Sequence, residues 1–328
     1  MTAGSMAAPS APVVARRTLR GRLAASLLAV VAAVLQRLPD RALHLFAEAA
    51  GRLVYAVQPA RRALVRANLE RVCRYLAEQG SASPAVVEAA RDRRALERLV
   101  RQAFGHYLRA YLEGAIVPAY DARRLRQRVI ADDQALAEQV LGKPGSGERR
   151  LLLVGLHFGA IEIPARWLVL VRGMALTSPM ETVADPDLQA YFERSRGATG
   201  LRVVPVRGAG RILAQRLAAG EAVAVVADRV VAGSGARVEL FGAPARLPLG
   251  PAVLAVESGA PAWVVAIRRV GWGQYRARLE QIEVPAEGPR RARLAAFLAG
   301  QARAFERAVA QAPEQWWTLF FPIWEDAA

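Results

Sequence analysis

Apolar runs and amphipathic stretches alternate along the second half of this chain. Four runs of strand length are almost entirely apolar, which is typical of strands buried on both faces: residues 151–156, 201–206, 222–227 and 262–267. Residues 211–219 and 251–258 instead show the three- and four-residue apolar spacing of helices. Residues 276–284 alternate and predict an antiparallel edge strand, and residues 290–311 predict an amphipathic helix. This alternation predicts an α/β fold with its ligand chemistry at strand ends and loops.

The pattern of the first half is helical. Over residues 41–117, apolar positions recur every three or four residues, with breaks at Pro59, residues 80–84 and Pro118. The pattern changes at residues 143–147. We therefore predict one domain over residues 41–328, with a helical part at 41–142 and an α/β part at 143–328.

The two ends of the chain depart from this pattern. Residues 1–15 are rich in Ala, Pro, Ser and Gly and predict a disordered tail. Four arginines then precede the apolar run 23–35, whose 13 residues fall short of the roughly 20 that a spanning helix needs. We favour a membrane-interfacial helix over residues 16–40, with a buried core helix and a cleaved secretory signal as alternatives. At the other end, residues 315–324 are unusually aromatic and either close the core or contact lipid.

Charge and cysteine content narrow the possible partners and compartments. The chain has 45 Lys and Arg against 29 Asp and Glu, a formal charge of +16 that implies an anionic partner. All the basic residues except Lys143 are arginine, which also fits a biased genome composition. The single cysteine, Cys73, excludes an internal disulfide and a cysteine-based zinc site, and it fits a reducing compartment. We expect no metal, because metal binding would have to rely on carboxylates.

His157 is the histidine best placed for chemistry, because it follows the predicted strand at 151–156. His44 and His106 lie in helical stretches. On one continuous helix, His157 and Glu162 would lie about 140° apart, so a hydrogen bond between them needs a bend. Gly159 permits that bend, and Pro164 places Glu162 near a helix start. Glu162 would then orient the imidazole for proton abstraction, while the alternative is a core histidine with an unrelated partner.

Residues 152–162, which include His157 and Glu162, resemble the His-x4-Asp/Glu signature of glycerolipid-type acyltransferases. They are most similar to the bacterial lipid A and phosphatidylinositol mannoside acyltransferases. Residues 61–73 resemble the family's Arg-Arg-x5-Asn-Leu stretch, and residues 104–109 resemble the helix that follows it. Asp228-Arg229 and residues 241–251 resemble the mannoside branch. The resemblance covers residues 20–325 in the family's order.

This resemblance implies a mixed sheet flanked by helices, preceded by a membrane-associating helical segment. It also implies transfer of an acyl chain from acyl-CoA or acyl carrier protein to a hydroxyl of a glycolipid such as a phosphatidylinositol mannoside or a lipid A-like acceptor, with no cofactor. By position, His157 is the general base and Glu162 its orienting carboxylate, while Glu181 and Arg196 match charged positions that help to place the acceptor. Arg237 departs from the mannoside branch, which commonly has an acidic residue there. We expect a monomer bound peripherally to lipids at the cytoplasmic face of the bacterial inner membrane, without nucleic acid.

The implied mechanism is direct attack of the acceptor hydroxyl on the thioester, without an acyl-enzyme. Consistent with this, the chain has no Gly-x-Ser-x-Gly elbow, and Cys73 lies in the helical part. Asp228, Arg229 and Arg246 are candidates to position phosphates of the donor or acceptor. A structural ion pair between Asp228 and a neighbouring arginine is the alternative.

Two other functions compete with the acyltransferase. Residues 203–213 predict a strand, a glycine turn and a helix, with Asp228 at about the distance of a dinucleotide-binding fingerprint, as in an oxidoreductase. Leu213, however, replaces the third glycine of that fingerprint. A non-catalytic basic protein that binds membranes or nucleic acid would also explain the charge, although no recognisable DNA- or RNA-binding module is present.

Overall fold

A computed structural model describes residues 18–80, 82–143, 149–231 and 235–325, so the predicted tail at 1–15 lies outside the described residues. A seven-stranded sheet forms the centre, in the spatial order β1 (Val129–Ala131), β9 (Gln274–Ile282), β8 (Ala262–Gly271), β2 (Leu152–Gly155), β5 (Ala222–Val226), β3 (Leu176–Met180) and β4 (Arg202–Pro205). The five strands from β8 to β4 are parallel, whereas β9 is antiparallel to β8 and β1 is parallel to β9. The predicted α/β fold is confirmed.

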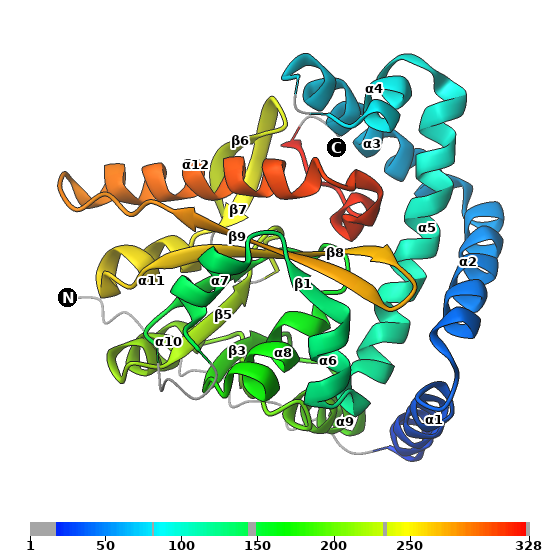
Figure 1. Cartoon of the computed structure of the whole chain (residues 1–328), viewed down its shortest axis with the longest axis horizontal. Helices are drawn as coiled ribbons and strands as arrows, with labels where there is room; N and C mark the ends of the chain where they lie inside the picture. The colour runs from blue at the N-terminus through cyan, green and yellow to red at the C-terminus, as the bar shows by residue number, and fades with distance from the viewer. Residues whose placement is uncertain (1–17, 81, 144–148, 232–234, 326–328) are drawn as a thin grey trace, which may run out of the picture.

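Both faces of the central strand β2 are buried, which explains its continuous apolar sequence. Leu152 and Val154 belong to one core cluster and Leu151 and Leu153 to another, as expected when successive side chains point to opposite faces. The first face is covered by α10 (Ala209–Ala218), α11 (Gly250–Ser258) and α12 (Arg290–Val309). The second is covered by α6 (Ala122–Arg128), α7 (Gln134–Leu141) and α8 (Glu162–Arg172), so that α11 and α12 lie on one side of the β8–β9 pair and α6 and α8 on the other (Figure 1).

The first half of the chain forms a helical layer beside the sheet (Figure 1), made of α1 (Leu19–Leu35), α2 (Asp40–Val57), α3 (Pro59–Glu78), α4 (Pro84–Arg91) and α5 (Arg93–Ile116). Pro59 and Pro84 begin helices, because proline is tolerated in a first helical turn. The backbones of α2 and α5 cross closely at two glycines, since a Cβ added at Gly51 would lie 2.7 Å from the Cα of Gly105.

The structure differs from the sequence-based predictions in three places. The strand predicted at 276–284 forms as β9, but it is not the sheet edge, because β1 pairs with its outer side. β1 lies within the part predicted to be helical, and its three residues are too few to produce a detectable alternation. β6 (Gly235–Leu240) and β7 (Ala243–Pro248) form a separate antiparallel hairpin, although the sequence analysis predicted no strands there.

The segment predicted as an interfacial helix forms α1, which contacts α5 and α9 (Pro186–Gly197). Only Gly21, Ala25 and Ala32 of this helix are buried, so it is not a core helix. Within the described residues, no helix has the combination of length and apolar character needed to cross a bilayer.

A sharp turn at Gly159 joins β2 to α8, as the sequence analysis predicted. Gly159 has a φ of +56°, and a Cβ at this position would lie 1.8 Å from the carbonyl oxygen of Ile267 in β8. The turn therefore requires glycine both for its backbone conformation and for its closeness to the neighbouring strand.

We expect Gly159→Ala to lower the free energy of unfolding by more than about 2 kcal/mol, because it adds a steric overlap to an unfavourable φ. Gly173→Ala is the matched control, since Gly173 has a φ of +71° with no atom within 4 Å of an added Cβ, so it tests the conformational cost alone. Chemical denaturation of both variants measures the difference. Equal losses of stability would contradict the predicted overlap with β8.

Candidate active site

His157 lies at the carboxyl end of β2, next to Asp228 at the end of β5. β2 and β5 are parallel, and Gly155 pairs with Val226, so the residues two positions further on fall side by side. The Nδ1 atom of His157 lies 2.7 Å from Oδ1 of Asp228, and the backbone N–H of His157 donates to Oδ2 at 3.0 Å. The imidazole remains about 20% exposed, whereas the Asp228 side chain has no exposed surface.

Asp228 is a buried carboxylate that its hydrogen-bond donors keep ionised. Trp316 donates to Oδ2 through its indole N–H at 2.8 Å, and the Thr318 hydroxyl donates to the same oxygen at 2.6 Å. Burial alone would raise the pKa of Asp228, but the charge of His157 and the hydrogen bonds from His157, Thr318 and Trp316 lower it to about 2. Because an ionised carboxylate only accepts hydrogen bonds, Nδ1 of a neutral His157 carries the proton and Nε2 is free to accept one.

The aromatic C-terminal segment closes the core and also holds the loop that carries His157. Phe158 forms an isolated antiparallel bridge with Trp316, and the Trp317 N–H donates to the His157 carbonyl at 3.0 Å. The Trp317 ring meets the imidazole edge to face, with 4.7 Å between ring centroids. Trp316 is fully buried. Trp316, Trp317 and Thr318 were not among the predicted site residues, because nothing local in the sequence indicates that the C-terminus returns to β2.

Glu162 begins α8, as predicted, but the structure does not show the expected hydrogen bond to His157. Its Oε1 lies 3.2 Å from the guanidinium of Arg196 in α9. The orienting carboxylate of His157 is instead Asp228, because the Nδ1 edge of the ring faces β5 rather than the start of α8. Glu162 and Arg196 nevertheless line the same cavity as His157.

The other candidate residues lie in different surroundings. Glu181 and Arg229 form an ion pair at 3.2 Å and line the His157 cavity, where Arg229 also stacks over the Phe321 ring. Arg246 lies on the β6–β7 hairpin, pairs with Glu325 at 2.9 Å, and borders a separate hollow of about 220 Å³. Asp228, which we expected to position phosphates or pair with an arginine, is sealed inside the protein and bonded to His157. A substrate therefore cannot reach its carboxylate.

A large cavity extends away from His157. Its volume is about 1320 Å³, above the usual range for small-molecule sites, and its walls are mostly apolar. It reaches from His157 at the carboxyl end of β2 to Arg150, which precedes the strand. Leucines from the sheet and from helices on both of its faces line the cavity, namely Leu153, Leu168, Leu176, Leu213 and Leu254. Such a cavity fits a long apolar ligand with one end at the imidazole.

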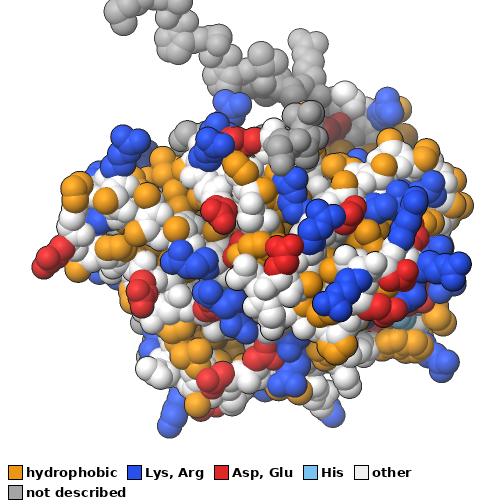
Figure 2. Space-filling view, turned by 90° about the horizontal axis from the view of Figure 1, so that it is seen from above, with side chains coloured by type: hydrophobic (Ala, Val, Ile, Leu, Met, Phe, Trp, Pro, Cys, Tyr) orange, Lys and Arg blue, Asp and Glu red, His pale blue; other side chains and the backbone are white. Residues whose placement is uncertain are grey.

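The structure gives no support to a dinucleotide site at Asp228 or to Cys73 as a nucleophile. Asp228 would have to accept hydrogen bonds from a ribose, but its oxygens are already bonded within the protein. Burial raises the pKa of the Cys73 thiol to about 12, so no reactive thiolate forms there. Within the described residues, no cluster of His, Cys, Asp and Glu could hold a metal ion. On the face shown in Figure 2, arginines are interspersed with acidic and apolar side chains rather than gathered in one patch.

The chain is similar in sequence to known acyltransferases. Residues 15–324 match the family described as bacterial lipid A biosynthesis acyltransferase. A phosphatidylinositol mannoside acyltransferase of Mycolicibacterium smegmatis is 30% identical over 181 residues, which are 53% of this chain and 58% of that protein. One from Mycobacterium tuberculosis is 35% identical over 108 residues, which are 32% of this chain and 34% of that protein. The chain thus matches less than two thirds of the length of either relative.

Glu314, two residues before Trp316, makes the stability of this segment depend on pH. Burial raises its pKa to about 7, so the folded protein binds this proton more tightly than the unfolded chain does. Unfolding releases the proton between about pH 4.5 and pH 7, and stability falls as the pH rises through that window. We expect Glu314→Gln to remove this loss, gaining about 3 kcal/mol relative to wild type between pH 4.5 and pH 8. Denaturant titrations at the two pH values measure it, and parallel pH dependences of the two proteins would contradict it.

Proposed function

This chain belongs to the family of bacterial lipid A biosynthesis acyltransferases, and on that premise we propose that it transfers a fatty acyl group to a hydroxyl of a glycolipid. The observation that carries the proposal is the pairing of His157 with buried Asp228 at one end of a large apolar cavity. The donor is acyl-CoA or acyl carrier protein, and the acceptor is a phosphatidylinositol mannoside or a lipid A-like glycolipid. The mannoside acyltransferases among its relatives support this acceptor class.

In the proposed mechanism, Nε2 of His157 takes the proton from the acceptor hydroxyl while the oxygen attacks the thioester carbonyl. A new C–O bond forms, and the tetrahedral intermediate then expels the thiolate, which receives the proton back from the imidazolium. Asp228 stabilises the imidazolium, because its carboxylate stays ionised beside Nδ1. Backbone N–H groups or an arginine of the cavity stabilise the oxyanion. No covalent acyl-enzyme is needed.

Charged residues of the cavity fit the placement of a polar acceptor beside the imidazole. The Glu162–Arg196 and Glu181–Arg229 pairs bring carboxylates and guanidinium groups to a cavity whose walls are otherwise mostly apolar. We propose that these pairs bind sugar hydroxyls and phosphate, and that Glu162 acts on the acceptor rather than directly on His157. Arg246, outside this cavity, would act on a part of a substrate that extends beyond it.

The outer helices provide a surface for lipid. Large apolar side chains of α1 and α2 are exposed, including Leu23, Leu27, Phe46 and Leu53, each with more than half of its surface accessible. Arginines on or between the same helices, such as Arg22, Arg37 and Arg52, fit anionic headgroups. We propose that this surface holds the protein peripherally on the cytoplasmic face of the bacterial inner membrane.

Substitutions at the His157–Asp228 pair test the mechanism. We expect His157→Ala to lower transfer by at least about 10³-fold, because it removes the base. Asp228→Asn should lower transfer by about 10²-fold or more, because an amide donor facing Nδ1 favours the wrong tautomer. Glu162→Gln should slow transfer with less effect on donor binding. Mass spectrometry of acylated products from acyl-CoA and glycolipid measures the rates.

The matched control is Asp132→Asn, which neutralises a carboxylate that pairs with Arg268 away from the cavity. It should leave transfer within about twofold of wild type. A folded His157→Ala protein with near wild-type turnover would overturn the assignment. Vesicle binding without any turnover by the wild-type protein would favour the non-catalytic alternative.

We expect the double variant Leu27→Asp, Phe46→Asp to bind anionic vesicles at least about tenfold more weakly, because charged side chains would replace apolar contacts on α1 and α2. Ile130→Asp is the matched control, since Ile130 in β1 is 58% exposed, as is Phe46, but lies outside these helices. Co-sedimentation with phosphatidylglycerol vesicles measures binding. Equal binding by both variants would refute the proposed surface.

A further inference from the structure

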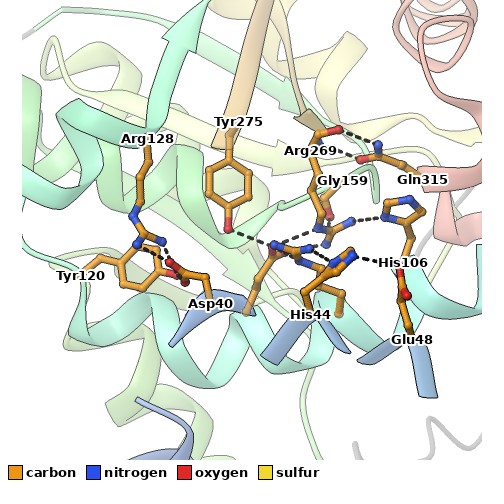
Figure 3. A network of polar contacts seen from close by, with 12 residues as sticks. Asp40, His44, Glu48, His106, Tyr120, Arg128, Gly159, Arg269, Tyr275 and Gln315 are labelled. Atoms are coloured by element: carbon orange, nitrogen blue, oxygen red, sulfur yellow. Dashed lines mark hydrogen bonds and ion pairs between the residues drawn. The ribbon is translucent and has the colours of Figure 1, made fainter. Parts of the chain in front are cut away.

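Three residues distant in sequence form a closed ring of hydrogen bonds around the loop that carries His157. The Gly159 N–H donates to the Gln315 carbonyl at 3.0 Å, and the Gly159 carbonyl accepts from the Arg269 guanidinium at 2.8 Å. The Gln315 carboxamide accepts from the Arg269 N–H and donates to the Arg269 carbonyl, each at 2.9 Å. Both backbone groups of Gly159, two residues after the imidazole, are therefore fixed. Figure 3 shows Arg269 beside Gly159, with dashed lines from its backbone to Gln315.

Gln315 bonds to β8 as a neighbouring strand would. At residue 269, β8 extends beyond the end of its neighbour β2, whose pairing with β8 ends at Gly155 and Val265. The carboxamide supplies the donor and acceptor that a longer β2 would have offered to the backbone of residue 269. The loop from His157 to Gly159 thus leaves the sheet without leaving buried backbone groups unpaired.

The Arg269 side chain is held in turn by Glu113 of α5. Both side chains are only 2% exposed, and two guanidinium nitrogens, Nε and Nη2, bond to the two carboxylate oxygens in a bidentate pair. The Tyr275 hydroxyl donates to the same carboxylate at 3.1 Å, and His106 lies 3.5 Å from the remaining guanidinium nitrogen. Burial and the charges of Arg269 and Arg109 lower the pKa of His106 well below its usual value, so this ring is neutral.

A buried ion pair of this kind is a weak source of stability. Taking both charges out of water costs about as much as their attraction returns, and apolar residues of similar volume are often as stable or more so. The pair instead fixes the orientation of the Arg269 side chain, because a planar guanidinium that is bonded through two of its nitrogens to one carboxylate cannot rotate. Its Nη2 atom bonds to Glu113 and also to Gly159.

We propose that Arg269 is a positioning residue for acyl transfer: oriented by Glu113, it fixes the Gly159 carbonyl and thereby the loop that presents His157 to the cavity. This rests on the proposed function, and it extends the machinery from the strand ends of β2 and β5 to the helical layer. Asp228 sets the tautomer and rotation of the ring, whereas Arg269 sets the position of the backbone from which the ring projects.

The test is Arg269→Lys, which keeps the charge beside Glu113 but loses the bidentate geometry and the bond to Gly159. We expect kcat to fall about 10- to 100-fold, because a small displacement of a base from its substrate has effects of that size. KM for the acyl donor should change less than about threefold, since the cavity walls are untouched. Arg268→Lys is the matched control: the side chain of this adjacent residue bonds to Asp132 and Gln311 and not to the loop, so kcat should stay within about twofold.

Glu113→Gln provides a second variant, because it keeps the shape of the carboxylate but loosens the hold on Arg269. It should lower kcat in the same direction by a smaller factor. The imidazole itself gives a readout independent of turnover: NMR of the His157 Nδ1 proton should show a shifted, faster-exchanging signal in Arg269→Lys and an unchanged one in Arg268→Lys.

A folded Arg269→Lys protein with wild-type kcat and an unchanged His157 signal would overturn the proposal. A loss of kcat that equals the loss of folded protein, measured by circular dichroism, would reduce Arg269 to a structural role and also overturn it. If the wild-type protein transfers no acyl group, the proposed function fails, but the His157 signal still tests the positioning. If Arg269→Lys does not fold, Glu113→Gln decides by the same two readouts.

Discussion

The structure depends on one interaction: the buried carboxylate of Asp228 stays ionised although water cannot reach it. The Asp228 side chain has no exposed surface, and such burial would ordinarily neutralise a carboxylate. It stays ionised because donors from three residues in two distant parts of the chain converge on it: the backbone and ring of His157, the Trp316 indole and the Thr318 hydroxyl. Those donors come together only if β2 and β5 are adjacent and parallel and the C-terminal segment returns to them. The same contacts thus keep Asp228 ionised and hold the C-terminal segment against β2 and β5.

Charge and apolar surface are separated within this site. The Asp228–His157 pair lies at one end of a cavity with mostly apolar walls, and the exposed partner is the imidazole rather than the carboxylate. The Glu162–Arg196 and Glu181–Arg229 pairs also line this cavity, so that ionic groups lie beside its apolar walls near the imidazole. A second buried ion pair, Arg269–Glu113, lies behind the loop rather than in the cavity. Both buried pairs therefore bond to the segment from His157 to Gly159, one through the imidazole and the other through the Gly159 carbonyl.

The fold class follows from local patterns that the sequence shows directly. Continuous apolar runs such as residues 151–156 are what strands buried on both faces require, and the confirmed strands β2, β4, β5 and β8 lie at or within these runs. β1 was missed because three residues carry no periodicity, and the β6–β7 hairpin was missed because prolines and glycines in that segment hide its alternation. Strand order is a property of pairing between distant segments, and no local pattern specifies it.

The sequence by itself placed His157 at a strand end, Gly159 at a turn and Glu162 at a helix start, because each depends on residues within a few positions. It did not determine which carboxylate bonds to the imidazole. Asp228 is 71 residues away and Trp316 is 159 residues away from His157, so only the register of two parallel strands and the path of the C-terminus bring them together. The short sequence separation favoured Glu162 as that partner. In the folded protein, Asp228 is the carboxylate that lies within hydrogen-bond distance of the imidazole, and a hydrogen bond depends on distance and direction in three dimensions.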